Sequence, residues 1–147
     1  MATQHGFTLI ELMIVITMIA MLSAIGLPAY QGYLQKAALT DMLQSVMPLK
    51  TAAELCAIEH GNVAACSSGS EGIPSPTPSR YIARLTLNHG QLAVHGGDML
   101  TGLTLTLTPE QQKNGLLRWQ QRCDSDSDAL RAACQSVFRF QSSGETP

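Results

Sequence analysis

An uninterrupted apolar segment near the N-terminus limits what this chain can fold into more than any other feature. The segment runs from Phe7 to Leu27, and Glu11 is its only charged residue. No charged residue occurs between Leu12 and Tyr30. A helix that spans a membrane needs about 20 apolar residues, each of which adds about 1.5 Å. The segment is long enough for this, so we expect a helix that can cross a membrane.

A secretory signal peptide and a plain membrane anchor are the simpler interpretations of such a segment. A signal peptide begins with basic residues and has a short apolar core, whereas the stretch before Phe7 contains no Lys or Arg. A plain anchor has no need of Glu11, because a carboxylate inside an apolar span is costly unless it is paired. Glu11 therefore indicates a function beyond anchoring.

No nearby basic residue can pair with Glu11, since the next one along the chain is Lys36. Cleavage between Gly6 and Phe7 would supply a cation, because it would place a new α-amino group four residues from Glu11. That amine could contact Glu11 in its own chain or neutralise Glu11 of a neighbouring copy. A buried pair that forms at only one axial offset would set the register between copies. We assign Thr8 and Glu11 to this register.

The residues from Gly6 to Glu11, Gly-Phe-Thr-Leu-Ile-Glu, resemble the processing motif of type IV prepilins, which also opens a long apolar stretch. The resemblance implies that a prepilin peptidase cuts after Gly6 on the cytoplasmic side and methylates the amine of Phe7. It also implies that Glu11 guides the addition of subunits to a filament. The leader departs from the family pattern, because His5 and the amino terminus are its only basic groups. Orientation by positive charge is therefore weakly specified.

Apolar residues continue past Pro28 at intervals of three or four as far as Cys56, with polar residues between them. This spacing is typical of an amphipathic helix. Joined to the apolar segment, it predicts one helix of about 50 residues and about 75 Å. Gly26 and Pro28 predict a soft joint within this helix, and in the pilin family the equivalent stretch is where the helix can extend on entering the filament. Gly61 is the expected C-cap.

The region after the helix carries the signals of a small antiparallel sheet. Residues 88–90 (Asn-His-Gly) predict a tight hairpin, and residues 114–115 (Asn-Gly) predict a second turn. We expect one α+β head, in which the sheet packs on the apolar face of the helix. A short helix at 128–134 and a segment at 137–140 that packs or adds an edge strand should follow. The expected strands cover residues 81–87, 91–95, 103–108 and 116–122.

The cysteines of the chain are Cys56, Cys66, Cys123 and Cys134, and all lie beyond the apolar segment. An even number in a small extracytoplasmic domain predicts two disulfides, for which three connectivities are possible. The sequence-local one pairs Cys56 with Cys66 and Cys123 with Cys134, and each bond would close a loop of about ten residues and contribute up to ~3 kcal/mol. A zinc site is the alternative, but the sequence has no Cys-x-x-Cys and no His at ligand spacing from a Cys.

A wider resemblance, to the type IVa major pilins of enterobacteria, covers most of the chain. It implies the type IV pilin fold: one long N-terminal α-helix packed on a four-stranded antiparallel sheet with disulfide-closed loops. It implies the sequence-local cysteine pairing and the partners of a homopolymer, namely an inner-membrane assembly platform, an assembly ATPase and minor pilins. The stretches that carry the resemblance are residues 33–44, 54–61, 72–77 and 133–140.

The expected division of the chain follows from the motif and the helix. Residues 1–6 are a leader that is cleaved, and residues 7–30 are the transmembrane and assembly half of the helix. Residues 31–147 are a periplasmic, then extracellular, head that includes the amphipathic half of the helix.

Asp124, Asp126 and Asp128 resemble the first ligands of an EF-hand calcium loop. Such a loop also needs Gly at its sixth position and Glu at its twelfth, where this sequence has Ala129 and Gln135. Calcium is therefore a weak candidate beside a solvated acidic loop, and we expect no cofactor and no other metal.

No feature of the sequence is specific to an enzyme or to a nucleic-acid-binding protein. The net charge of −2 favours no basic surface for nucleic acid. His60, His89 and His95 lack a catalytic or ligand pattern, so we interpret them as surface or packing residues, and we expect Trp119 in the core.

The leading prediction is a structural subunit, the major pilin of a type IV pilus. Its precursor would cross the inner membrane once with a cytoplasmic N-terminus and then polymerise into a surface filament for adhesion, motility or DNA uptake. The alternative is a pseudopilin of a type II secretion system, which shares the motif and the helix but forms a short periplasmic piston. The cysteine pairs and residues 137–140 favour the pilin, whereas a calcium site would favour the pseudopilin. A third class is an anchored binding protein that never polymerises.

Overall fold

The computed structural model describes residues 6–140 of the chain. These residues belong to two units, of which the first ends at Leu34 and the second begins at Gln35. One helix, α1 (Leu9–His60), has 52 residues and contributes to both units. Its length confirms the prediction of a single helix that includes the apolar segment and the amphipathic stretch.

The first unit consists of the non-helical residues 6–8 and the part of α1 up to Leu34. Every residue from Gly6 to Tyr33 is exposed, and Phe7 and Ile25 are 82% and 78% exposed. By length and composition, α1 can cross a membrane. A helix that is apolar all round needs lipid or other protein around it, because water solvates such a surface poorly.

The predicted joint at Gly26 and Pro28 lies inside α1, which is helical on both sides of it. Proline removes one backbone hydrogen bond from a helix, yet the helix does not end here. A side chain at Gly26 would meet no atom within 4 Å, so packing does not require the glycine. The joint stays a prediction.

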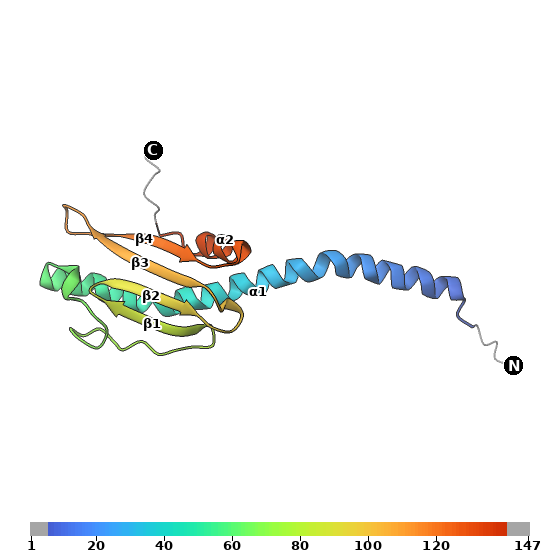
Figure 1. Ribbon diagram of the computed structural model, residues 1–147, viewed down its shortest axis with the longest axis horizontal. Coiled ribbons are helices and arrows are strands. Elements are labelled where there is room, and N and C mark those ends of the chain that lie inside the picture. The colour runs from blue at the N-terminus through green and yellow to red at the C-terminus, as the bar shows by residue number, and fades with distance from the viewer. Residues whose placement is uncertain (1–5, 141–147) are drawn as a thin grey trace. The chain divides into compact units, whose positions relative to one another are not determined.

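In the second unit, one face of α1 packs against a four-stranded antiparallel sheet of order β1-β2-β3-β4 (Figure 1). The buried positions of α1 recur every three or four residues, which confirms the amphipathic stretch. They are Ala38, Leu39, Met42, Val46, Leu49, Ala53, Cys56 and Ala57. The strands are β1 (Ile82–Asn88), β2 (Gln91–Gly96), β3 (Thr104–Gln111) and β4 (Leu117–Asp124).

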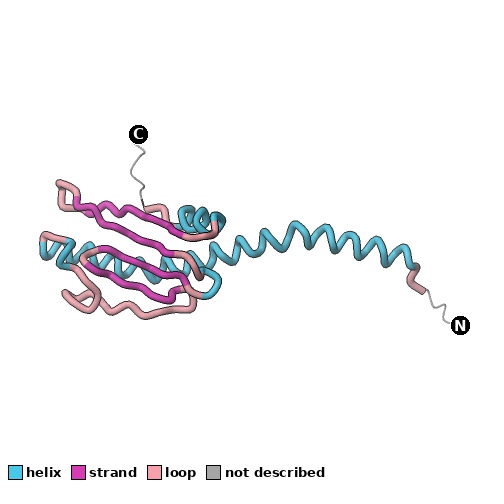
Figure 2. The backbone as a smooth tube through the Cα atoms, in the orientation of Figure 1, coloured by secondary structure: helices cyan, strands magenta, loops and turns pink. Residues whose placement is uncertain are grey.

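The turn residues have the backbone conformations that their positions require. His89 and Gly90 have φ angles of 49° and 79°, and two consecutive positive values are typical of a type I′ turn. The predicted hairpin between β1 and β2 is therefore confirmed. Gly61 has φ 67° directly after α1, as expected for a C-cap. The chain from there to Tyr81 is mostly loop (Figure 2).

The sheet covers the helix with alternating side chains. Leu103, Leu105 and Leu107 are no more than 1% exposed, and the threonines between them project from the other face because strand residues alternate. Trp119 is 4% exposed and belongs to the same core. The strand pattern read from the sequence is confirmed here.

The predicted short helix is α2 (Asp128–Val137), which begins after the N-cap Ser127 and is three residues longer than expected. Of the two possibilities for residues 137–140, the edge strand is wrong. Val137 ends the helix and Phe138 is fully buried. Two large aromatic side chains in four residues gain more from entering the core than from pairing at a sheet edge.

Two disulfides close local loops in the second unit. Cys56 is bonded to Cys66, and Cys123 to Cys134. The first bond ties α1 to the loop that follows it, and the second ties β4 to α2. This is the sequence-local pairing implied by the family resemblance.

Candidate functional site

The residues before and at the start of α1 form the candidate site. Gly6 and Phe7 are exposed and lie outside the helix. A side chain added at Gly6 would meet no atom within 4 Å. The bond between them therefore lies in a non-helical, accessible stretch of chain, as a protease substrate must.

Thr8 and Glu11 are joined by three hydrogen bonds. The Thr8 backbone N–H donates to Glu11 Oε2 at 3.0 Å, and the Thr8 hydroxyl donates to the same oxygen at 2.7 Å. The Glu11 backbone N–H donates to Thr8 Oγ1 at 3.4 Å. This reciprocal arrangement is a capping box, in which an N-cap Thr and the Glu three residues later satisfy amide groups that the first helical turn leaves unpaired.

The capping box changes the interpretation of Glu11. The sequence indicated a cation as the partner of Glu11, whereas the structure supplies neutral donors from within the same chain. The signal was present, because Thr-x-x-Glu before an apolar run is the pattern of a capping box. The role of Thr8 as the N-cap was missed for this reason.

Glu11 keeps capacity for a further partner. The Glu11 carboxylate accepts both of these hydrogen bonds through Oε2, and Oε1 makes no hydrogen bond with any residue in the range 6–140. An ionised carboxylate offers about four lone-pair sites. Oε1 could therefore accept a hydrogen bond from an ammonium group while Oε2 stays bound to Thr8.

The acidic loop predicted as a weak calcium candidate has another arrangement. Ser127 Oγ accepts from the Leu130 N–H and caps α2. Asp128 pairs with Arg131 at 2.8 Å, and Arg131 also donates to the Ser125 carbonyl. Within the described part of the chain, no three His, Cys, Asp or Glu side chains are grouped to hold a metal ion. The loop forms the start of a helix, where acidic residues are favourable.

The histidines take the surface positions expected of them. His60 Nε2 lies 3.0 Å from a carboxylate oxygen of Glu71. His89 Nδ1 lies 3.0 Å from the Ala64 carbonyl, and His95 Nδ1 lies 3.3 Å from Thr104 Oγ1. All three histidines are exposed.

Comparisons with known proteins place this site in a family. Residues 1–27 match a family model described as the prokaryotic N-terminal methylation motif. A type IV major pilin protein, PilE1 of Neisseria gonorrhoeae, is 31% identical over 123 residues, which cover 79% of this chain and 74% of that relative. The chain belongs to the type IV pilin family. Membership of this family implies that copies of the chain polymerise and that a prepilin peptidase processes them.

A second relative matches nearly the whole chain. Prepilin peptidase-dependent protein D of Escherichia coli (strain K12) is 54% identical over 142 residues, covering 95% of this chain and 97% of that relative. The solution NMR structure of the major type IV pilin PpdD from enterohemorrhagic Escherichia coli has a TM-score of 0.66 at 46% identity. It covers 78% of this chain and 89% of the solved one. These likenesses support the type IV pilin fold predicted from the sequence.

Proposed function

We propose that this protein is the major subunit of a type IV pilus. Its precursor is cut after Gly6, methylated at the amine of Phe7 and polymerised into a surface filament. The observation that carries the proposal is the start of α1, where an accessible Gly-Phe bond precedes a capped Glu11 and an apolar surface exposed on all sides. The pilin names of the relatives support it.

The capping box suggests how Glu11 acts in two stages. Before cleavage, Thr8 reduces the cost of keeping the carboxylate in an apolar environment, because two donors already point at Oε2. After cleavage, the new amine of Phe7 is a cation without a fixed partner. Oε1 of Glu11 on a neighbouring copy can accept it, and the pair forms at one axial offset only. That offset sets the register of each added subunit.

The same proposal assigns the remaining parts of the chain. Residues 1–6 are the leader, residues 7–30 the membrane and assembly half of the helix, and residues 31–147 the head. The N-terminus of the precursor is cytoplasmic. The partners are a prepilin peptidase, an inner-membrane assembly platform, an assembly ATPase, minor pilins and further copies of the chain.

Shearing of cells tests the proposal against the pseudopilin alternative. Cells that express the protein at native level are sheared, and the released material is immunolabelled for electron microscopy. Long labelled fibres are expected. Processed protein that stays in the envelope without surface fibres would contradict the major-pilin proposal and would favour a short periplasmic fibre.

A further inference from the structure

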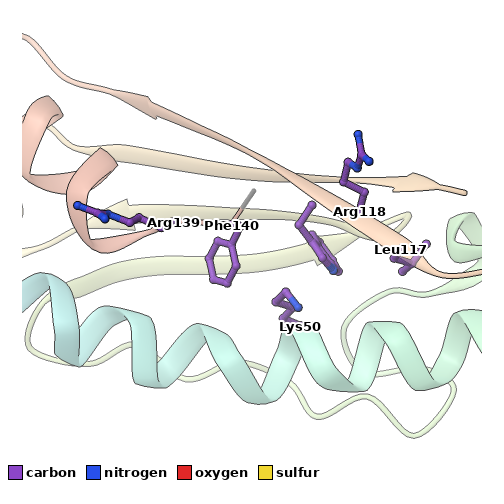
Figure 3. A pocket seen from close by; sticks show the side chains of 6 residues that line it. Lys50, Leu117, Arg118, Arg139 and Phe140 are labelled. Carbon is purple, nitrogen blue, oxygen red and sulfur yellow. The ribbon is translucent and has the colours of Figure 1, made fainter. Parts of the chain in front are cut away.

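The hollow in the head contains an ion pair that is complete within one copy. About 240 Å³ in volume, it lies in the second unit between α1, β4 and the residues that follow α2 (Figure 3). Lys50 Nζ donates to Glu54 Oε1 at 2.6 Å, and the same oxygen accepts from Trp119 Nε1 at 2.8 Å. Lys50 therefore has its counter-charge inside the head. The hollow is lined by Lys50, Leu117, Arg118, Trp119, Arg139 and Phe140.

Two tyrosines of the first unit lack such partners. Tyr30 and Tyr33 are 61% and 70% exposed, and their hydroxyl groups make no hydrogen bond with any residue in the range 6–140. They lie three residues apart on α1, so their side chains are neighbours on the helix surface. A phenol combines an apolar ring with a hydroxyl group that needs a hydrogen-bond partner. The two side chains therefore suit surroundings that are apolar on one side and polar on the other.

The tyrosines lie where the apolar segment ends. The chain has no aromatic residue between Phe7 and Tyr30, so the aromatic residues of the first unit lie at the two ends of the segment. Helix α1 begins at Leu9, and its rise from there to Tyr30 is about 32 Å at about 1.5 Å per residue. The hydrocarbon core of a bilayer is about 30 Å thick. A helix that enters the core at Leu9 therefore brings Tyr30 to the headgroups of the opposite leaflet.

The first charged residue beyond the tyrosines is a cation. Lys36 is the next charged residue after Glu11 in the sequence. It is exposed and forms no ion pair within residues 6–140. An ammonium group close to a membrane surface is attracted by anionic lipid headgroups, and tyrosine is enriched at membrane–water interfaces because its ring is amphipathic. The order of residues along α1, apolar, then phenolic, then cationic, matches the order of layers from hydrocarbon to headgroup.

We propose that Tyr30 and Tyr33 bind the lipid headgroups of the leaflet that faces the head and fix the depth of the precursor in the membrane. This inference rests on the proposed membrane-bound precursor and does not need polymerisation. The rings lie among the upper acyl chains, and the hydroxyl groups donate to ester or phosphate oxygens of the lipids. Lipid is the partner because the tyrosines directly continue the surface of a helix that can cross a membrane. The predicted joint at Gly26 and Pro28 then lies just inside the bilayer.

A depth measurement in vesicles tests the contact. The full chain with Ser23→Cys is labelled with a nitrobenzoxadiazole probe and reconstituted into vesicles of phosphatidylethanolamine and phosphatidylglycerol. Because the described cysteines are all in disulfides, Ser23→Cys adds the only new thiol. Lipids that carry a nitroxide high or low on the acyl chain quench the probe according to its depth. The ratio of shallow to deep quenching is the quantity compared between variants.

Tyr30→Ala with Tyr33→Ala should raise this ratio about twofold, because the apolar segment then recentres in the bilayer and Ser23 moves toward the surface. Tyr30→Trp with Tyr33→Trp should keep the starting ratio, since an indole is also amphipathic. Gln31→Ala is the matched control, because Gln31 is exposed and lies between the tyrosines but has no ring. The melting temperature of the head should be the same in every variant, since all three positions are exposed residues of the first unit.

The possible outcomes separate this contact from the proposed function, because the vesicles contain no assembly machinery. An unchanged ratio in the alanine variant, an equal change from Gln31→Ala, or no rescue by tryptophan would overturn the headgroup contact. A change that occurs only at high ratios of protein to lipid would also overturn it, since a second copy would then be the partner of the tyrosines. The expected ratios from a chain that forms no surface fibres in cells would overturn the proposed function and keep the contact.

Discussion

The two halves of α1 differ in where their partners come from. From Gly6 to Tyr33 every residue is exposed, and within the described residues Glu11 is held only by Thr8, from the same turn. Beyond Gln35, 8 residues of the helix are buried, and Glu54 is held by Lys50 and by Trp119 of the sheet. The first half therefore needs lipid or other copies of the chain to cover it, whereas the second is covered by its own sheet. Substitutions in the two halves should change different measurements.

The largest expected effect is on processing. Gly6→Arg should abolish cleavage, because the proposed peptidase must accommodate the residue before the cut. An arginine side chain is too large for a site that accepts a glycine. The measurement is the intact mass of the protein in the envelope. A normal mature mass from this variant would show that the assigned cut is wrong.

Next in size is a matched pair of leucines, one from each half of the helix. Leu39 is fully buried and Leu22 is 74% exposed. Leu39→Ala should lower the free energy of unfolding by about 3 kcal/mol and the melting temperature by roughly 10 °C or more. Leu22→Ala should leave the melting temperature of the full chain in detergent unchanged. An equal fall in melting temperature for the two variants would mean that the head does not fold independently of the first half of α1.

A third prediction concerns Glu11. Glu11→Ala should leave the mature mass normal and lower the filament yield about tenfold, equivalent to ~1.4 kcal/mol in subunit addition. Glu59→Ala is the control, because Glu59 is an exposed residue of the second half of α1. The measurement compares sheared filaments with processed subunit in the envelope. Wild-type yield from Glu11→Ala would remove the register role.

The smallest effect should come from the capping hydroxyl. Thr8→Ala removes an N-cap worth about 1 kcal/mol, so filament yield should fall about fivefold, less than for Glu11→Ala. Thr8→Ser keeps a hydroxyl at the same position and should stay near wild type. Equal yields from the alanine and serine variants would show that the hydrogen bonds of Thr8 have no part in assembly.

The features of the fold that could be predicted from the sequence are those that depend on local residue spacing. The leucines at 103, 105 and 107 alternate, and the buried residues of α1 recur every three or four positions, so strand and helix follow from the period alone. His89-Gly90 and Gly61 mark turns, because few other residues adopt positive φ. The capping box is also local, but a lone carboxylate in an apolar segment points to an ionic partner before it points to a hydroxyl donor.

The parts that could not be predicted depend on distant contacts. Trp119 Nε1 bonds Glu54 across 65 residues, and no spacing in the sequence indicates that pairing. The hollow around Lys50 exists because α1, β4 and Arg139–Phe140 meet there. The sequence left open whether residues 137–140 pack or add an edge strand, and a distant contact decides between the two, since Phe138 enters the core.

The Cys56–Cys66 disulfide has a mechanical consequence. Cys56 belongs to α1, and the Cys66 carbonyl accepts from the Gly90 N–H at 2.8 Å, in the turn between β1 and β2. Tension applied along the helix therefore passes into the loop beside the hairpin through a covalent bond. Hydrogen bonds and packed side chains yield under load long before such a bond breaks. A pull on α1 could therefore loosen the packed face of the helix while its Cys56 end stays attached to the loop beside the hairpin.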